Sequence, residues 1–364
     1  MKASILSLAT AVPAFSFTQE EITNTLIDML SVDDQNTKMI QKLHQNSEIY
    51  RRHSVISDFK KTRSEWDFWG KDFPKKIPGM SQRNALYEIE APKLACEAVK
   101  KALENWGGDL QDITHIIAIS CTGLIAPGIE FMIMREFNLN PSVQRLGINF
   151  MGCFGAFKGL SVANSFAKEN PNHRILVVCV ELCTLHFQVE QTHDNMLANS
   201  LFSDGAAAMI IGANPKAHEK SLWEIGNKSS YALDNSMDKM KWDAGDHGFN
   251  IKLSHTVPVF IKKHIASFVQ NLLGDSYNSH EYDWAIHPGG KSIIQAVEKA
   301  LKLEEGSSKA SWDTLADFGN MSSATFVFVL QKMLEQDDKK KWTVGLAFGP
   351  GLSVEGILLK GSNI

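Results

Sequence analysis

The sequence lacks the features that mark several large classes of protein. No stretch without a charged side chain reaches the roughly 18 residues that a membrane-crossing helix needs, so no segment is expected to span a membrane. Its 37 basic and 41 acidic residues are mixed along the chain, with neither a dense basic arm nor a zinc-finger spacing. These absences argue against an integral membrane protein and against a nucleic-acid partner.

Cysteine is scarce as well. The chain contains five cysteines: Cys96, Cys121, Cys153, Cys179 and Cys183. An odd, sparse set does not predict a disulfide framework, and free thiols are typical of a reducing cytoplasm, where we expect the protein. A metal cluster of Cys179, Cys183 and His186 is one alternative, but no second ligand pair lies nearby. Because RILVVCVELCTLHF is rich in Val, Ile and Leu, it predicts a buried strand that enters a loop, and we expect no metal.

The N-terminal segment, MKASILSLATAVPAF, allows two interpretations. One positive charge, an apolar stretch and an A-x-A-like ending form a weak signal-peptide pattern. The same segment fits a first β-strand that is followed by a turn at Pro13. The free cysteines favour the strand.

Short β-like runs alternate with helical stretches along the chain. Strands are expected at 114–120, 174–180 and 206–212, and helices at 91–106 and 292–303, where apolar residues recur at helical spacing. Alternating strands and helices predict an α/β fold with packed layers. With 364 residues, 44% of them apolar, the chain can bury a substantial core.

Two parts of the chain resemble each other at a long period. Cys121 and His287 each follow a strand candidate, in AISCTG and WAIHPGG. The spacing from Cys121 to Cys153 equals the spacing from His287 to Asn320 to within one position. Further on, GAAAMIIGANP closes the first part as GLSVEGILLKG closes the second. The repeat predicts two similar α/β halves, 1–214 and 222–364, related by a pseudo-twofold axis.

The repeat puts chemically active side chains at matched positions. Cys153 and Asn320 each follow a glycine and precede a helical run, so the two halves are expected to bring them together with His287. A helix start would lower the pKa of the Cys153 thiol and favour a nucleophilic thiolate. His287 would pair with that thiolate, and the Asn320 amide would donate to a developing oxyanion.

Each residue taken alone has a simpler interpretation. Cys153 fits a buried structural cysteine, His287 a capping or core histidine, and Asn320 a helix N-cap. The FGPG segment at 348–351 fits a plain hairpin turn or a wall of the site. The matched positions in the two halves favour the catalytic interpretation.

With these residues in view, the sequence resembles the type III polyketide synthases, the chalcone-synthase-like family, over about residues 3–361. The motifs that carry the resemblance are FMGCFGA around Cys153, AIHPGG around His287, GNMSSA around Asn320, FGPGLS at 348–353 and LFSDGAAAMIIG around Phe202. The resemblance implies a duplicated thiolase fold with five αβαβα layers, a homodimer, and a catalytic triad of Cys153, His287 and Asn320. It also implies a gatekeeping role for Phe202.

The resemblance further implies an acyltransferase that works on CoA thioesters, with no metal or redox cofactor. Cys153 takes the starter from an acyl-CoA, and malonyl-CoA loses CO₂. His287 and Asn320 stabilise the resulting enolate, which attacks the Cys153 thioester and extends the chain. After a few rounds the polyketide cyclises.

Departures from the plant enzymes predict an altered substrate pocket. Ile251 replaces a second gatekeeping Phe, Ala126 a Met, Cys121 a Thr, and Trp242 a Gly. The smaller side chains at 251 and 126 favour a fatty acyl starter, although Trp242 takes some of that room back. The expected substrate-binding residues are Phe202, Cys121, Ile251, Ala126, Trp242, Ser322, Phe348, Gly349, Pro350 and Gly351.

The segments SCTGLIAPG and ELCTLHF resemble bacterial members of the family, which make alkylpyrones, alkylresorcinols or tetrahydroxynaphthalene. Cys121 fits a malonyl-primed synthase of the last kind. Three further interpretations stay open. A ketosynthase III shares the triad but extends a chain once, a papain-like hydrolase has Cys, His and Asn in the same order without a repeat, and an inactive scaffold predicts a broken triad.

Overall fold

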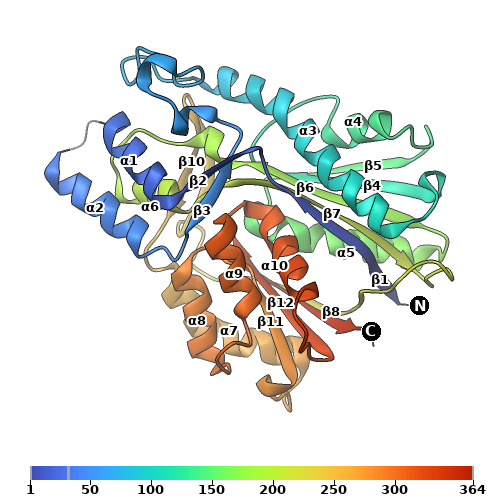
Figure 1. Cartoon of the computed structure of the whole chain (residues 1–364). Helices are drawn as coiled ribbons and strands as arrows, with labels where there is room; N and C mark the ends of the chain where they lie inside the picture. The colour runs from blue at the N-terminus through green and yellow to red at the C-terminus, as the bar shows by residue number, and fades with distance from the viewer. Residues whose placement is uncertain (1, 31–32, 363–364) are drawn as a thin grey trace.

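The computed structural model describes residues 2–30 and 33–362, and a single nine-stranded mixed sheet runs through it (Figure 1). The strand order is β11-β12-β13-β8-β1-β7-β6-β4-β5. The strands are β1 (Ala3–Ala11), β4 (Ile113–Ser120), β5 (Gln144–Asn149), β6 (Arg174–Leu182), β7 (Asp204–Ala213), β8 (Trp223–Ala232), β11 (Tyr282–Ile286), β12 (Trp342–Gly349) and β13 (Ser353–Gly361). Mixed strands with helices on their faces confirm the α/β class.

The strands predicted at 114–120, 174–180 and 206–212 form β4, β6 and β7. The first residues form β1, which pairs with β7 on one side and with β8 on the other. Every residue of β6 is buried, which explains why residues 175–180 form an unbroken apolar run rather than an alternating one.

The pairing pattern occurs twice in the sheet. β4 runs parallel to β6, which is antiparallel to β7, which is antiparallel to β1. In the same order, β11 runs parallel to β12, which is antiparallel to β13, which is antiparallel to β8. The two sets meet where β1 pairs with β8, and residues 214–222 form the loop between β7 and β8. β5 extends the first set beyond β4.

Helices cover these strands in layers. Helices α5 (Gly155–Glu169) and α10 (Thr325–Leu334) share one apolar core with β1, β4, β6 and β7, and the rings of Phe157 and Phe326 lie 4.3 Å apart. A second core forms under α3 (Met80–Trp106), and a third under α7 (Val257–Leu273) and α8 (Lys291–Leu301). The central pair of helices thus brings the two halves of the chain together.

The helix expected at 91–106 is the second part of α3, which begins at Met80. Pro92 lies inside this helix and does not end it, although proline usually marks a helix boundary. Tertiary packing explains the exception, since Tyr87, Ala91 and Leu94 are all buried in the core beneath α3.

Smaller elements gather at one end of the molecule, around the carboxyl ends of the parallel strands (Figure 1). They are α1 (Gln19–Leu30), α2 (Asp34–Gln45), α6 (His193–Leu201), β2 (Phe15–Thr18), β3 (Arg51–Ser54), β9 (Met240–Gly245) and β10 (Gly248–Leu253). Two further helices, α4 (Ile129–Glu136) and α9 (Lys309–Phe318), complete the fold. Ligands of open α/β sheets bind at such strand ends.

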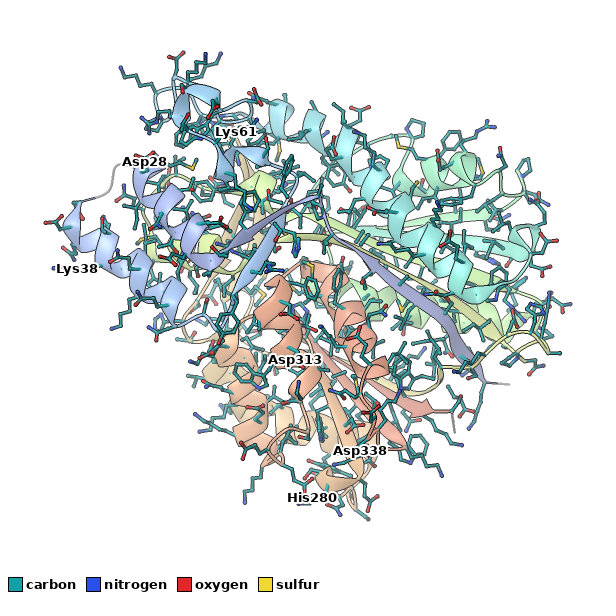
Figure 2. All side chains as sticks on the ribbon, in the orientation of Figure 1. Asp28, Lys38, Lys61, His280, Asp313 and Asp338 are labelled. Carbon is teal, nitrogen blue, oxygen red and sulfur yellow. The ribbon has the colours of Figure 1, made fainter. Side chains whose placement is uncertain are left out.

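Charged side chains such as Lys38 and Asp338 are exposed around the outside of the molecule (Figure 2). Within the described residues, no helix is both long enough and apolar enough to cross a membrane.

Candidate active site

Cys153 and Asn320 are held by turns of the same construction. Cys153 lies in a 3₁₀ turn, Gly152–Phe154, that leads into α5, and Asn320 precedes a 3₁₀ turn, Ser322–Ala324, that leads into α10. Gly152 and Gly319, which come directly before them, have φ angles of 67° and 68°. Only glycine adopts this left-handed conformation without strain, so the two glycines set the direction from which each functional side chain enters the site.

The strand ends approach the same place. Cys121 follows β4 and His287 follows β11, so each lies at the carboxyl end of a parallel strand. The Cys121 sulfur accepts a hydrogen bond from the Gly152 amide at 3.0 Å, and the His287 amide donates to the Leu346 carbonyl at 2.8 Å. The end of β4 therefore contacts the turn that carries Cys153.

Cys153, His287 and Asn320 line one cavity of about 610 Å³. The Cys153 sulfur lies 3.9 Å from both the Oδ1 and the Nδ2 atoms of Asn320, although the two residues are 167 positions apart in the sequence. The structure thus brings together three residues on elements from both halves.

Burial dominates the electrostatics of the cavity. It raises the pKa of the Cys153 thiol to about 12, and hydrogen bonds to Ser322 and Asn320 oppose this rise. Burial also lowers the pKa of His287 to about 3. The expected lowering of the thiol pKa by a helix start is therefore wrong, because desolvation disfavours the thiolate more than the turn favours it.

His287 is 1% exposed, and both of its ring nitrogens are buried without a hydrogen-bond partner among residues 2–30 and 33–362. Unpaired buried polar atoms are costly and are typical of functional sites. A thiolate and an imidazolium formed together offset each other's charge, so Cys153 and His287 are expected to titrate as a pair rather than separately.

The Asn320 side chain is held with its amide nitrogen available. Its Oδ1 atom accepts from the Ser322 backbone N–H at 2.9 Å, and its Nδ2 atom donates one N–H to the Gly289 carbonyl at 3.4 Å, which leaves the other N–H on the side of the Cys153 sulfur. Because the oxygen is already occupied, the side chain presents N–H donors rather than an acceptor to a group bound near Cys153.

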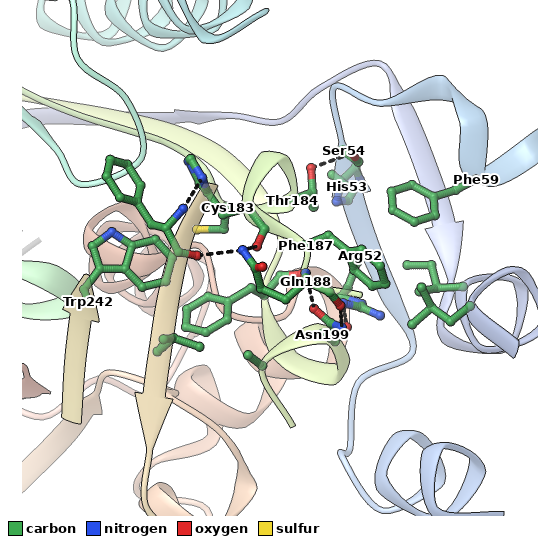
Figure 3. A pocket seen from close by; sticks show the side chains of 17 residues that line it. Arg52, His53, Ser54, Phe59, Cys183, Thr184, Phe187, Gln188, Asn199 and Trp242 are labelled. Atoms are coloured by element: carbon green, nitrogen blue, oxygen red, sulfur yellow. Dashed lines mark hydrogen bonds between the residues drawn. The ribbon is translucent and has the colours of Figure 1, made fainter. Parts of the chain in front are cut away.

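Phe202 and Ile251 separate the large cavity from a smaller one, since both residues line both. The smaller cavity has a volume of about 40 Å³ and is lined by Trp242 (Figure 3). The Trp242 indole donates to the Cys121 carbonyl at 2.8 Å, which fixes the β9–β10 hairpin to the end of β4. Trp242 therefore lies behind the partition instead of lining the Cys153 cavity.

The remaining predicted residues surround the triad in different ways. Phe348 lines the large cavity, and the Pro350 ring packs so closely on Gly152 that a Cβ there would lie 2.4 Å from it. Gly349 packs on Phe154, and the Gly351 amide donates to the Met240 carbonyl at 3.1 Å. The 348–351 segment thus supports the Cys153 turn from one side.

Ala126 is not brought to the Cys153 cavity within this chain. It lines a separate pocket together with Tyr87, Leu124 and Asn149.

His186, the third member of the alternative metal cluster, uses both ring nitrogens in hydrogen-bond contacts, to the Thr122 carbonyl at 2.7 Å and the Phe249 amide at 3.0 Å. In the described part of the chain, no group of three or more His, Cys, Asp or Glu residues is arranged to hold a metal ion.

Glu181 is a site residue that sequence reasoning missed. It is fully buried at the end of β6 and accepts hydrogen bonds from the Cys121 amide and the Thr122 hydroxyl, both at 2.9 Å, and from the Ser323 hydroxyl. Glu181 therefore ties the end of β4 to the turn after Asn320. The sequence signal was a single acidic residue in an otherwise apolar strand.

Comparisons with known proteins agree with this geometry. Residues 1–215 match the N-terminal domain of chalcone and stilbene synthases, and residues 224–363 match the C-terminal domain. A probable polyketide synthase of Dictyostelium discoideum is 33% identical over 98% of this chain, although the chain spans 11% of that relative's length. Type III polyketide synthase A of Arabidopsis thaliana is 30% identical and is matched over 99% of this chain and 93% of its own length.

A Mycobacterium tuberculosis protein described as an alpha-pyrone synthesis polyketide synthase-like protein is 31% identical, over 98% of this chain and 90% of its own. Among solved structures, the C-terminal type III polyketide synthase domain of Steely1 from Dictyostelium superposes with a TM-score of 0.92 at 32% identity, over 99% of each chain. A brown algal synthase from Ectocarpus siliculosus gives 0.93 at 25% identity, over 99% of this chain and 98% of its own. The chain therefore belongs to the chalcone and stilbene synthase family of type III polyketide synthases, which are condensing enzymes with a thiolase-like fold.

Proposed function

We propose that the protein loads an acyl group from acyl-CoA onto Cys153 and extends it repeatedly with malonyl-CoA, before the chain cyclises. The observation that carries the proposal is the convergence of Cys153, His287 and Asn320 on one cavity of about 610 Å³. A half-buried thiol, an unpaired neutral imidazole and an amide donor are the groups that thioester exchange and enolate stabilisation require.

Loading begins with a proton transfer. His287 takes the thiol proton of Cys153, and the thiolate attacks the thioester carbonyl of the starter. CoA leaves as the free thiol after it regains a proton from His287, and the acyl group stays on Cys153. Since burial penalises either charge alone, the proton transfer is favourable when the two charges form as neighbours.

Extension uses the same donors on a second substrate. Malonyl-CoA loses CO₂, and the enolate oxygen of its thioester accepts hydrogen bonds from His287 and the Asn320 amide. The carbanion attacks the thioester carbonyl on Cys153, the C–S bond to Cys153 breaks, and the longer chain leaves as a CoA thioester. Cys153 is released as a thiolate, which attacks this new thioester and takes the chain back for the next round, with release of CoA. CoA thioesters are then substrates, and the proposed reaction includes no step through a metal or a redox cofactor.

The cavity lining favours a fatty acyl starter. Apolar side chains make up much of the wall beyond the triad: Leu43, Leu197, Leu201, Met240, Leu253, Val257 and Ile293. Lys42 and Lys291 also line the cavity; the Lys291 ammonium is paired with Glu48 at 2.7 Å, so Lys42 provides the positive charge for the CoA phosphates. The name of the mycobacterial relative supports a pyrone product, and Cys121 supports the malonyl-primed tetrahydroxynaphthalene alternative.

We also propose a cytoplasmic homodimer. β5 lies at the edge of the sheet, and exposed apolar side chains gather near its end: Leu124, Leu146, Phe150 and Met151, each at least 37% exposed. An exposed sheet edge beside an apolar surface is suited to pairing with a second copy of the chain.

A product profile by mass spectrometry tests the function. Purified protein is incubated with malonyl-CoA alone and then with acyl-CoA starters of increasing length, with Cys153→Ala as the control. Pyrones or resorcinols from long starters, absent in the variant, support the proposal. An aromatic product from malonyl-CoA alone would mean that the starter is malonyl-CoA and not a fatty acyl-CoA. A product of a single condensation would indicate a ketosynthase III. Release of fatty acid without a new C–C bond would reject the synthase function.

A further inference from the structure

Arg52 is a buried cation close to the site, and the triad mechanism does not use it. It lies on β3, is 4% exposed, and lines the small cavity behind Phe202 (Figure 3). Its Nη1 atom donates to the carbonyls of Asn199 at 2.7 Å and Phe202 at 2.9 Å, and its Nε atom donates to Gln19 at 2.8 Å. The guanidinium therefore contacts the end of α6 that leads to the partition residue.

The consecutive carbonyls at the end of α6, from residue 199 to residue 202, all receive donors from other elements. Arg52 donates to the carbonyls of residues 199 and 202, and the Gln19 side chain donates to the Ser200 carbonyl at 2.8 Å. The backbone N–H of Asn320 donates to the Leu201 carbonyl at 2.9 Å. The last carbonyls of a helix have no partner within it, so these donors fix where the helix ends.

The same contacts bind Phe202 to Asn320. The Asn320 carbonyl accepts from the Ser203 amide at 2.9 Å, so residues 202 and 320 form an isolated β-bridge. The aliphatic stem of Arg52 passes under Gly319, where a Cβ would lie 3.1 Å from its Cγ atom. Arg52 thus touches both the helix end before Phe202 and the turn before Asn320.

Burying Arg52 is unfavourable in itself. Burial lowers the pKa of Arg52 to about 9, and the nearby Asp204 carboxyl opposes this shift, so the guanidinium is still charged at neutral pH. Its Nη2 atom is buried without a hydrogen-bond partner among the described residues. A buried charge with an unsatisfied donor contributes little net stability, and such groups are often kept for the geometry they impose.

We propose that Arg52 is a positioning residue that holds Phe202 and Asn320 as one unit against the Cys153 cavity. This inference rests on the proposed function, since it assigns Arg52 to the extension step, in which Asn320 acts. Cys153 and His287 are carried by other elements, the Gly152–Phe154 turn and the end of β11, so loading of the starter is expected to depend less on the contacts of Arg52 than extension does.

The experiment compares Arg52→Met and Arg52→Lys with Arg51→Met, a change at the exposed neighbour on β3. Loading of Cys153 is followed by intact-protein mass spectrometry, and malonyl-CoA decarboxylation and kcat for extension are measured separately. Arg52→Met is expected to lower decarboxylation and kcat by about 30-fold while loading stays within about threefold, because a shift of about 1 Å at a donor has effects of this order. Arg52→Lys is expected to restore part of the loss, and Arg51→Met to leave all rates unchanged.

Equal losses of loading and decarboxylation in Arg52→Met, in proportion to the folded fraction, would indicate a structural role and overturn the proposal. Unchanged decarboxylation would overturn it as well. If Arg52→Met does not fold, Gln19→Met removes the Nε acceptor and keeps Arg52, and a smaller loss confined to decarboxylation is expected. Wild-type protein that neither loads nor decarboxylates would reject the proposed function itself.

Discussion

The two halves of the molecule use one framework for different chemistry. In each, a parallel strand ends at a site residue, a left-handed glycine precedes the second site residue, and a helix of the central layer follows. The first half puts sulfur at both positions, Cys121 and Cys153, whereas the second puts an imidazole and an amide at His287 and Asn320. The framework therefore fixes where groups meet, and side-chain identity fixes what they do there.

The halves also differ behind the site. Glu181 follows Cys153 at the same spacing as Phe348 follows Asn320, and the two residues lie at the ends of β6 and β12. Glu181 accepts hydrogen bonds from polar groups of both halves, whereas Phe348 lines the Cys153 cavity. In the proposed reaction, the first half thus contributes the nucleophile and a polar support, and the second contributes proton transfer and part of the cavity wall.

The two sulfurs of the first half give the sharpest test of this division. Cys153→Ala is expected to reduce polyketide formation by about 10³-fold or more, because the proposed reaction holds the acyl chain on this sulfur. Cys121→Ala removes a sulfur that accepts only a backbone hydrogen bond, so rates are expected to fall less than about tenfold. Acyl adducts on Cys121 in intact-protein mass spectra would contradict the assignment.

The second half is tested by separating its two donors. His287→Gln is expected to slow alkylation of Cys153 by iodoacetamide at pH 7 by about 100-fold, since burial keeps the thiol protonated without a base. Asn320→Ala should leave alkylation within about threefold but lower malonyl-CoA decarboxylation by about 100-fold, the usual effect of losing one oxyanion donor. Parallel losses of both activities in both variants would mean that the two residues do not have separate roles.

The matched glycines test the shared framework. An alanine at Gly152 meets the rigid Pro350 ring at 2.4 Å, and one at Gly319 meets the Leu201 carbonyl at 2.9 Å, in addition to left-handed strain. Gly306→Ala is the matched control, because Gly306 is also left-handed but has open space around it. All three variants are expected to lose about 1–2 kcal/mol of stability from strain. The two site variants should also lose activity by about tenfold, measured as kcat at full folding.

Local patterns predicted the strands, the helices and the repeat well, because strand periodicity and turn glycines depend only on residues that are adjacent in the sequence. They also identified Cys153, His287 and Asn320 as candidates, which the structure brings to one cavity. The length of α3 was underestimated because packing over Pro92 overrides its breaking effect. The packing of α3 on the core cannot be predicted from a pattern of consecutive residues.

The interactions between elements could not be found in this way. Glu181 and Arg52 form hydrogen bonds with partners that are distant in the sequence. The residues next to them in the sequence do not indicate which partners these are. The thiol pKa was misjudged for the same reason, since it depends on burial by both halves. Trp242 lies behind the partition because of the position of the β9–β10 hairpin, which is fixed by the hydrogen bond from the Trp242 indole to the Cys121 carbonyl.

The smallest expected effect concerns buried histidines at the site end of the first half. Burial, with the nearby Arg52 charge, lowers the pKa of His44 to about 3, well below its value in the unfolded chain. Between pH 6.5 and 3 the unfolded chain therefore binds one more proton at this position, so this contribution to stability is complete above pH 6.5 and is lost as the pH falls. From pH 7.5 to pH 5, wild type should lose about 2 kcal/mol more unfolding free energy than His44→Gln, measured by urea denaturation. The exposed His218→Gln variant should follow wild type, and equal pH slopes for all three proteins would show that His44 does not contribute to the acid sensitivity.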